Sequence, residues 1–308
     1  MRVSSNPNLR ETPFLSPKDT YADGGWDAVK QDAEEKADLL LSLGINVNLA
    51  PVCDMTSDEY GFMYDRSFSS DVDMENRYVR TVVETSKSKK LGTVLKHFPG
   101  YGNNSDTHTG IAYDDRDYSE FENTDFKPFY QGIESGADCI LVSHNIVNCM
   151  DSEYPASLSQ KVHDILRNEF KFDGVIMTDD LIMDAITDFT GDEAAAVTAA
   201  KCGNDLLCCS SVDTQYPAVL EAVQNGEIPE AQVDASVKRI LKWKQNLGIF
   251  NIDTYQKKAA LVSGAQVYKS CAISASDSNG PHMRICSAQA ADELLYIDGV
   301  DASFVLYR

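Results

Sequence analysis

The loop from Lys96 to His108 contains the residues of this chain whose types and spacing are best suited to chemistry. It follows a short apolar run, Thr93 to Leu95, and brings a lysine, two histidines, two glycines and an aspartate close together. A connecting loop has no structural use for this many titratable groups, and such groups at the carboxyl end of a strand are typical of a catalytic site. In the alternative interpretation, Asp106 caps a turn and His108 is solvated.

Asp106 and His108 are spaced to act as a pair. In an extended loop, side chains two residues apart point the same way, so the Asp106 carboxylate can accept a hydrogen bond from Nδ1–H of His108. This fixes the tautomer and leaves Nε2 as a proton donor, and an imidazole with an ordinary pKa of about 6.5 can give and take a proton at neutral pH. The spacing therefore predicts a general acid/base.

Two adjacent acids, Asp179 and Asp180, end another apolar run, which begins at Gly174. Either acid could cap the helix that follows, whereas an ionised aspartate at the end of a buried strand could attack an electrophilic carbon. Arg66 has a planar fork that suits the oxygens of a polar ligand, although a surface ion pair with Asp65 explains it equally well. A nucleophilic aspartate, a histidine donor and two cations together suggest glycoside cleavage with retention.

The elements that would position these residues alternate between strands and helices from about residue 27 onward. Continuously apolar runs such as CILV (139–142) are typical of strands buried on both faces of a parallel sheet. Repeated strand–helix units indicate a closed (β/α)8-type barrel or an open doubly wound sheet, and the lack of a GxGxxG run or a Walker lysine counts against a nucleotide-binding open sheet. The expected strands are 45–51, 93–98, 139–143, 174–178 and 205–209, and the expected helices are 27–43, 76–90, 125–135, 159–169, 193–201, 216–224 and 230–247.

Polar residues follow four successive expected strands, and this pattern favours the barrel. The carboxyl ends of barrel strands open onto one face, where a site can assemble. The residues at these positions are Asp54, Lys96 with His97, His144 with Asn145, and Asp179 with Asp180.

The composition argues against several classes of partner. A net charge of −21 at pH 7 disfavours nucleic acid and anionic membrane surfaces but does not penalise a neutral sugar. No apolar run reaches the roughly 20 residues of a membrane-spanning helix, and no signal peptide is visible after Met1. The eight cysteines show no CxxC spacing, so we expect no zinc site and a reducing, cytoplasmic location, with export of a longer precursor as the alternative.

The alternation ends near residue 250, which predicts a barrel domain at residues 1–250 and a C-terminal tail at 251–308. Residues 270–281 are rich in Ser, Asp, Asn and Gly, whereas 294–297 and 303–307 are apolar enough for two short strands. We expect the tail to pack as an appendage on the barrel or on a partner subunit. In the second case the chain would form a homodimer through its tail.

Six ordered motifs make the chain similar to a known family. They are GINVNLAPVCD (44–54), DRSF (65–68), KHFPGYG (96–102), DTH (106–108), PASLS (155–159) and GVIMTDDLIM (174–183). On these motifs the chain resembles glycoside hydrolase family 3, and within it the NagZ-type bacterial β-N-acetylglucosaminidases, or β-hexosaminidases. The resemblance extends from about residue 44 to residue 248.

The resemblance implies a fold, a reaction and a set of site residues. It implies a (β/α)8-type barrel and a retaining reaction through a covalent glycosyl-enzyme, with no metal and no organic cofactor. It makes Asp179 the nucleophile, His108 the acid/base and Asp106 the residue that orients His108. The residues that would hold the terminal N-acetylglucosamine are Lys96, His97 and Arg66, with Asp54 and His144 lining the pocket.

The two ends of the chain depart from the family pattern. Family members begin with a strand that ends in an Asp/Glu-Gly-Gly run, whereas this chain opens with Met1-Arg2-Val3. The residues after 250 do not match the family's ending. Two alternatives follow, a complete barrel and a barrel without its first strand.

The expected function is that of an exo-acting β-N-acetylglucosaminidase that hydrolyses terminal β-linked N-acetylglucosamine in peptidoglycan or chitin-type fragments. A β-glucosidase, an N-acetylglucosamine phosphorylase and an inactive sugar-binding protein are the alternatives. The phosphorylase stays open because a neutral histidine, unlike a carboxylate, does not repel an incoming phosphate.

Overall fold

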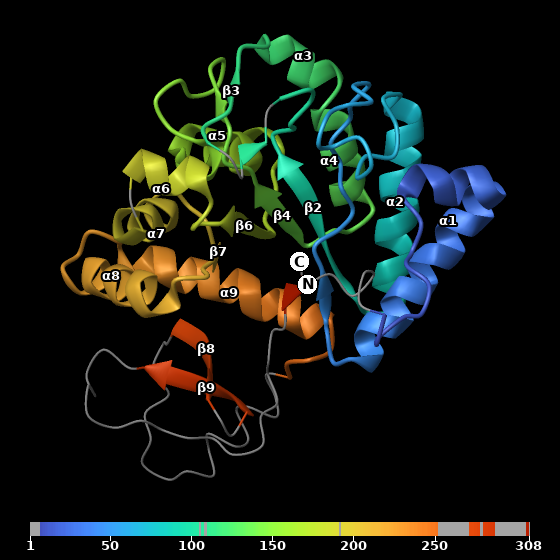
Figure 1. Ribbon diagram of the computed structural model, residues 1–308. Coiled ribbons are helices and arrows are strands. Elements are labelled where there is room, and N and C mark those ends of the chain that lie inside the picture. The colour runs from blue at the N-terminus through green and yellow to red at the C-terminus, as the bar shows by residue number, and fades with distance from the viewer. Residues whose placement is uncertain are drawn as a thin grey trace.

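The centre of the molecule is a curved sheet of parallel strands with helices packed around it (Figure 1). This computed structural model describes residues 7–104, 106–107, 110–190, 192–251, 271–277, 280–286 and 306–307. The strand order is β10-β1-β2-β4-β6-β7, and each neighbouring pair is parallel. The bounds are β1 Val47–Asn48, β2 Gly92–Phe98, β4 Cys139–Val142, β6 Val175–Asp180, β7 Leu206–Cys208 and β10 Leu306–Tyr307.

Helices connect successive strands of the sheet, because parallel neighbours need long crossovers. A small parallel pair, β3 (Tyr113–Asp114) with β5 (Ile146–Val147), lies outside the main sheet. The α-helices are α1 Pro17–Ser42, α2 Val72–Ser88, α3 Tyr118–Asn123, α4 Phe126–Glu134, α5 Gln160–Asp164, α6 Asp184–Thr190, α7 Asp192–Lys201, α8 Val212–Gln224 and α9 Glu230–Asn246.

The predicted elements are confirmed, with differences at their ends. The helix predicted from residue 27 begins earlier, at Pro17, and continues across a break at Gly24 and Gly25. The helix predicted at 159–169 is α5 followed by a π-helical turn, Ile165–Glu169. Its cap is as expected, because the Ser159 hydroxyl accepts a hydrogen bond from Val162 N at 3.2 Å. The strand predicted at 174–178 continues to Asp180 and so includes both acids.

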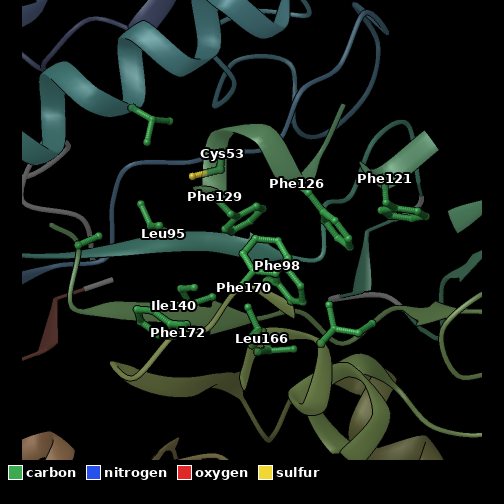
Figure 2. Packing of buried hydrophobic residues seen from close by; sticks show 14 of the residues in the cluster. Cys53, Leu95, Phe98, Phe121, Phe126, Phe129, Ile140, Leu166, Phe170 and Phe172 are labelled. Atoms are coloured by element: carbon green, nitrogen blue, oxygen red, sulfur yellow. The ribbon is translucent and has the colours of Figure 1, made fainter. Parts of the chain in front are cut away.

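The central strands are buried on both faces, as their continuous apolar runs predicted. Alternate side chains enter two different clusters: Leu95 and Ile140 belong to one, and their neighbours Val94 and Leu141 belong to the other. The first cluster lies between the sheet and helices α2, α4 and α5. Phenylalanine rings fill much of it (Figure 2), where Phe98 contacts the rings of Phe126, Phe129 and Phe170 at centroid distances of 5.5, 5.2 and 5.4 Å.

Helix α9 packs against the other face of the sheet, at the amino ends of the strands. Trp243 of α9 and Leu247, the residue that caps this helix, join the cluster that contains Val47. A Cβ atom built on Gly92 would lie 3.0 to 3.1 Å from side-chain atoms of Val47, Leu247 and Trp243. The amino ends of β1 and β2 therefore leave no room for a larger side chain at position 92.

The described sheet has six strands, of the eight that a closed barrel needs. Within those residues β7 and β10 are its edge strands, so the arrangement is a curved half-barrel, which confirms the parallel α/β class. Part of the predicted strand 303–307 is found as β10, with Leu306 opposite Val47, whereas 294–297 lies outside the described residues. The antiparallel hairpin of β8 (Cys271–Asp277) and β9 (Gly280–Cys286) was not predicted. No helix in the described part of the chain is long and apolar enough to cross a membrane.

Removal of the Phe129 ring is expected to destabilise the whole fold. Phe129 is fully buried between α4 and β2, so Phe129→Ala should lower the free energy of unfolding by about 3–5 kcal/mol through lost burial and the cavity left behind. Urea unfolding followed by circular dichroism measures this loss. Tyr60→Ala is the control, because Tyr60 is 98% exposed and its loss should cost less than about 0.5 kcal/mol. Equal shifts in the two variants would contradict the packing described for α4.

Candidate active site

The carboxyl ends of the strands bring together residues that are far apart in the sequence. Asp54 lies just beyond β1, Lys96 and His97 are in β2, His144 follows β4, and Asp179 is in β6. All five side chains are buried. The structure thus places these predicted residues along one end of the sheet, as the barrel hypothesis required.

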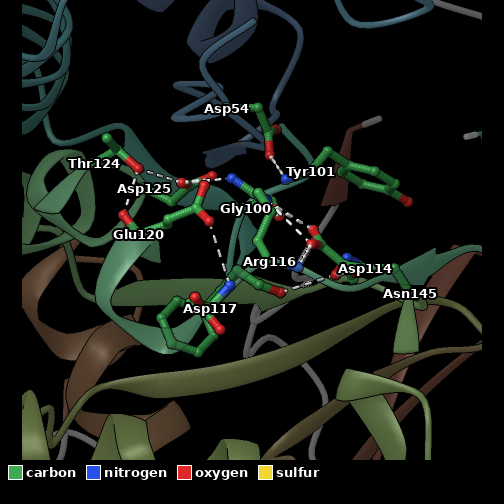
Figure 3. Close-up of polar contacts among 12 residues, drawn as sticks. Asp54, Gly100, Tyr101, Asp114, Arg116, Asp117, Glu120, Thr124, Asp125 and Asn145 are labelled. Atoms are coloured by element: carbon green, nitrogen blue, oxygen red, sulfur yellow. Dashed lines mark hydrogen bonds and ion pairs between the residues drawn. The ribbon is translucent and has the colours of Figure 1, made fainter. Parts of the chain in front are cut away.

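Asp54 and His97 form a buried pair at the centre of this end. Oδ2 of Asp54 accepts hydrogen bonds from Nδ1 of His97 at 2.7 Å and from the His97 backbone N at 3.0 Å. Oδ1 accepts a third from the backbone N of Tyr101 at 2.8 Å (Figure 3). Burial opposes the charge on Asp54, but His97 and the Tyr101 N–H outweigh it and hold the pKa of this carboxyl below its ordinary value. Asp54 is therefore ionised at neutral pH.

Arg66 contacts the opposite side of the His97 ring. Its Nη2 lies 3.2 Å from Nε2 of His97, and since an arginine can only donate, Nε2 must be the acceptor. The ring proton then sits on Nδ1 and is donated to Asp54. Burial lowers the pKa of His97, the Asp54 carboxylate opposes this, and the charges of Lys96 and Arg66 lower it further. The neutral His97 ring thus bridges the Arg66 guanidinium and the Asp54 carboxylate. The position of Arg66 is explained by its contact with His97 and not by an ion pair with Asp65.

The adjacent acids of β6 have different surroundings. The Asp180 carboxylate accepts hydrogen bonds from the Ser210 hydroxyl and from the backbone N–H groups of Ser210 and Ile182. It therefore connects the ends of β6 and β7, which is a structural role. Asp179 accepts the backbone N–H of Asp180 at 2.9 Å and keeps 7% of its surface exposed. Asp180 is buried to the same degree, at 6% exposed, so the two acids differ in these hydrogen-bond partners, and the nucleophilic role of Asp179 stays a prediction.

His144 also contacts the carboxyl end of β6. Its Nε2 donates to the carbonyl oxygen of Asp180 at 3.0 Å, and its Nδ1 accepts from the Ser157 hydroxyl at 2.7 Å. Both ring nitrogens are engaged with the protein and the side chain is fully buried. These contacts hold the carboxyl end of β6 in place.

The loop after β2 is held by a contact with the segment after β1 and by a contact within the loop itself. The hydroxyl of Thr56 donates to Oδ1 of Asn103 at 2.7 Å, and the hydroxyl of Tyr101 bonds to that of Thr107. Asp106, the predicted partner of the acid/base, is partly buried in this loop. His108 lies outside the described residues, so its contact with Asp106 stays a prediction.

Arg116 ties the start of this loop to the segment that follows it, a role that sequence reasoning missed. Its guanidinium donates to Asp114 at 2.8 Å, to Asp125 at 2.9 Å and to the carbonyl oxygen of Gly100 at 3.2 Å (Figure 3). Gly100 has a φ of +124°, and a Cβ there would lie 2.3 Å from Oδ1 of Asp125. The only sequence signals were a glycine beside a proline and a pair of acids before an arginine, which are common in loops.

The Tyr101 hydroxyl is buried among negative charges of the site. Burial raises the pKa of Tyr101, the Thr107 hydrogen bond opposes this, and the negative charges of Asp179, Asp54 and Asp106 raise it further. The Tyr101 hydroxyl therefore stays protonated at neutral pH. Among the described residues, no group of three or more His, Cys, Asp or Glu side chains is placed to hold a metal ion.

Comparison with known families agrees with this geometry. Residues 15–243 match the model of the glycosyl hydrolase family 3 N terminal domain. The chain belongs to this family. A Beta-hexosaminidase of Hydrogenovibrio crunogenus is 32% identical over 245 residues, which are 78% of this chain and 67% of that protein. Two further Beta-hexosaminidases, from Nitrosomonas eutropha and Methylobacillus flagellatus, are matched over 51% and 56% of their lengths, so the chain spans about half to two thirds of these curated relatives.

Solved structures of the family share the fold. The glycoside hydrolase family 3 beta-N-acetylglucosaminidase of Paenibacillus sp. str. FPU-7 has a TM-score of 0.72 at 28% identity, covering 83% of this chain and 47% of that one. A beta-glucoside phosphorylase has a TM-score of 0.73 at 24% identity, covering 77% of this chain and 45% of that one. At that identity the second likeness concerns the fold alone.

His97 is expected to make stability depend on pH. Its pKa is lowered in the folded state, so the unfolded chain binds a proton near pH 6.5 that the folded chain does not. The stabilising effect is present above about pH 6.5 and is lost as the pH falls toward the folded-state pKa, with a slope of about 1.4 kcal/mol for each pH unit in that interval. His97→Gln removes this titration, and urea unfolding of both proteins between pH 7.5 and 5.5 measures it. A difference in stability that stays constant with pH would contradict a neutral, buried His97.

Proposed function

We propose that the chain is a retaining exo-β-N-acetylglucosaminidase. The observation that carries the proposal is the placement of Asp179 at the carboxyl end of β6, the same end of the sheet at which Asp54, Lys96 and His97 lie. The loop that contains the predicted acid/base follows β2 at this end. Membership in glycosyl hydrolase family 3 and the names of the relatives support the same reaction.

The proposed reaction has two steps at the anomeric carbon. Asp179 attacks this carbon while His108 protonates the departing oxygen, which forms a glycosyl ester on Asp179. His108 then removes a proton from a water molecule that attacks the same carbon, the Asp179 ester breaks, and the configuration is retained. Asp106 orients His108 for both transfers. The reaction needs no cofactor.

The cations and the paired histidine are proposed to bind the terminal sugar. Arg66 and Lys96 can donate to hydroxyl oxygens; Arg66 contacts the His97 ring, and the charges of both lower the pKa of His97. Because Asp54 fixes His97 in one orientation, the polar surface presented to the sugar is rigid before binding. His144 contributes by supporting the end of β6. Such a site suits terminal β-linked N-acetylglucosamine, in peptidoglycan or chitin-type fragments.

Two expectations about the whole chain stay predictions. We infer that residues 251–308 are a C-terminal tail, which the family match ending at residue 243 supports; because its β10 pairs with β1 of the sheet, the dimer contact that we propose would use other parts of this tail. The cytoplasmic location expected from the cysteine pattern is part of the same proposal.

Loss of either proposed catalytic group should abolish most turnover of 4-nitrophenyl β-N-acetylglucosaminide. His108→Ala should lower kcat by about 10²- to 10⁴-fold, the usual contribution of a general acid/base, and Asp179→Ala by at least as much. Asp173→Ala is the matched control, because Asp173 is 79% exposed and pairs with Arg239 away from the site. Full activity in the Asp179 and His108 variants would remove the assignment.

Arg66→Lys should weaken substrate binding more than it slows the reaction. The lysine keeps the charge but loses the fork, so one or two charge-assisted hydrogen bonds disappear and KM should rise roughly 10-fold or more. The change in kcat should stay within about 3-fold, as for an interaction made equally in the ground and transition states. Arg77→Lys is the control, since Arg77 stacks on Trp26. A fall in kcat at constant KM would place Arg66 in the chemistry instead.

A phosphorylase is the second candidate, because the proposed acid/base is a neutral imidazole. Products formed with and without phosphate separate the two reactions: a sugar 1-phosphate identifies the phosphorylase and free N-acetylglucosamine the hydrolase. Rates on the matching glucoside test for a β-glucosidase. Calorimetric binding of N-acetylglucosamine without turnover of any aryl glycoside would identify an inactive sugar-binding protein.

A further inference from the structure

Tyr101 is a buried residue of the site that the proposed mechanism does not use. It is 3% exposed and lies between Gly100 and Gly102, both with φ in the left-handed region. We propose that Tyr101 is a positioning residue, whose hydroxyl holds Thr107, the residue that precedes the proposed acid/base in the chain. This inference rests on the proposed function and names a further residue on which it depends.

The backbone and ring of Tyr101 are fixed by the binding residues. Its N–H donates to Oδ1 of Asp54 at 2.8 Å. Its ring meets the His97 ring edge-on at a centroid distance of 5.3 Å and the Phe62 ring at 5.2 Å. A Cβ on the following Gly102 would lie 2.8 Å from Cζ of Arg116, so the backbone is confined on that side as well. The Tyr101 side chain therefore has a position set by the Asp54–His97 pair.

The Tyr101 hydroxyl connects this fixed side chain to Thr107, further along the same loop. It bonds to the Thr107 hydroxyl, and Thr107 is fully buried. Thr107 stands between Asp106 and His108 in the chain, so fixing its side chain limits where its two neighbours can lie. The bond joins two buried hydroxyls, and removing either one leaves the other without its partner.

The Tyr101 hydroxyl keeps its proton throughout the proposed reaction. The charges of Asp179 and Asp106 both act on it, together with that of Asp54. Tyr101 stays protonated at working pH because burial and these charges raise its pKa, so the contact with Thr107 does not titrate during the reaction. A catalytic group displaced by about 1 Å can lose roughly 100-fold in rate, which makes such a fixed contact important for the acid/base.

The test compares two aryl N-acetylglucosaminides with different leaving groups. Phenolate needs a proton from the general acid as it departs, whereas 2,4-dinitrophenolate departs without one. Tyr101→Phe and Thr107→Val each remove one hydroxyl and keep the shape. Each should lower kcat/KM about 10- to 100-fold for the phenyl substrate and less than about 3-fold for the dinitrophenyl substrate. This is the selective pattern expected of His108→Ala, the reference variant.

Two controls separate positioning from general destabilisation. Tyr118→Phe also removes a tyrosine hydroxyl bond, to Glu169 at 2.7 Å, away from the site, and should leave both rates unchanged. Amide hydrogen exchange measured by mass spectrometry should become faster in peptides covering residues 102–110 in Tyr101→Phe and Thr107→Val, and should not change there in Tyr118→Phe.

The outcomes are distinct for the two proposals. Equal losses on both substrates, or unchanged exchange in residues 102–110, would overturn the positioning role while leaving the glycosidase intact. If the wild-type chain turns over neither substrate, the proposed function fails and the catalytic role of Tyr101 fails with it. Selective loss on the phenyl substrate together with faster exchange is the result expected.

Discussion

The carboxylate of Asp54 is the contact on which the rest of the site depends. A fully buried charge is unfavourable unless several donors surround it. Here three N–H groups do so, two from His97 and one from Tyr101. They come from the end of β2 and from the loop beyond it, so one side chain after β1 fixes two further segments. Through His97 it also places the Arg66 guanidinium.

Around Asp54, some polar residues have a structural role and others are proposed to take part in the reaction. Asp180 and His144 use their polar atoms to hold strand ends together, and the buried carboxylate of Asp179 lies next to Asp180 in the same strand. Arg116 stabilises the loop after β2 through its contacts with Asp114, Asp125 and Gly100, much as Asp180 stabilises the end of β6. The residues proposed to react are thus held in place by neighbouring residues that have no proposed role in the reaction.

The sequence was sufficient for the elements of the sheet and for the residues at strand ends. Continuous apolar runs and short polar sequences after them are local signals, and they located β2, β4 and β6 together with Asp54, His97 and Asp179. Local signals cannot show which atoms meet. The Arg66–His97 contact joins residues 31 positions apart, and the Arg116 contacts depend on how a loop folds back, so neither was predicted. The early start of α1 at Pro17 was missed because its two glycines interrupt the helical pattern.

The packing of α9 closes one end of the sheet. Trp243 and Leu247 fill the inner side of the sheet at the amino ends of β1 and β2, so that end is blocked by apolar side chains. The reaction proposed above would then use the same opening, at the carboxyl ends of the strands, for entry and exit of the sugar. A released monosaccharide would have to diffuse out before the next terminal unit of the glycan could enter, which suits removal of one unit at a time.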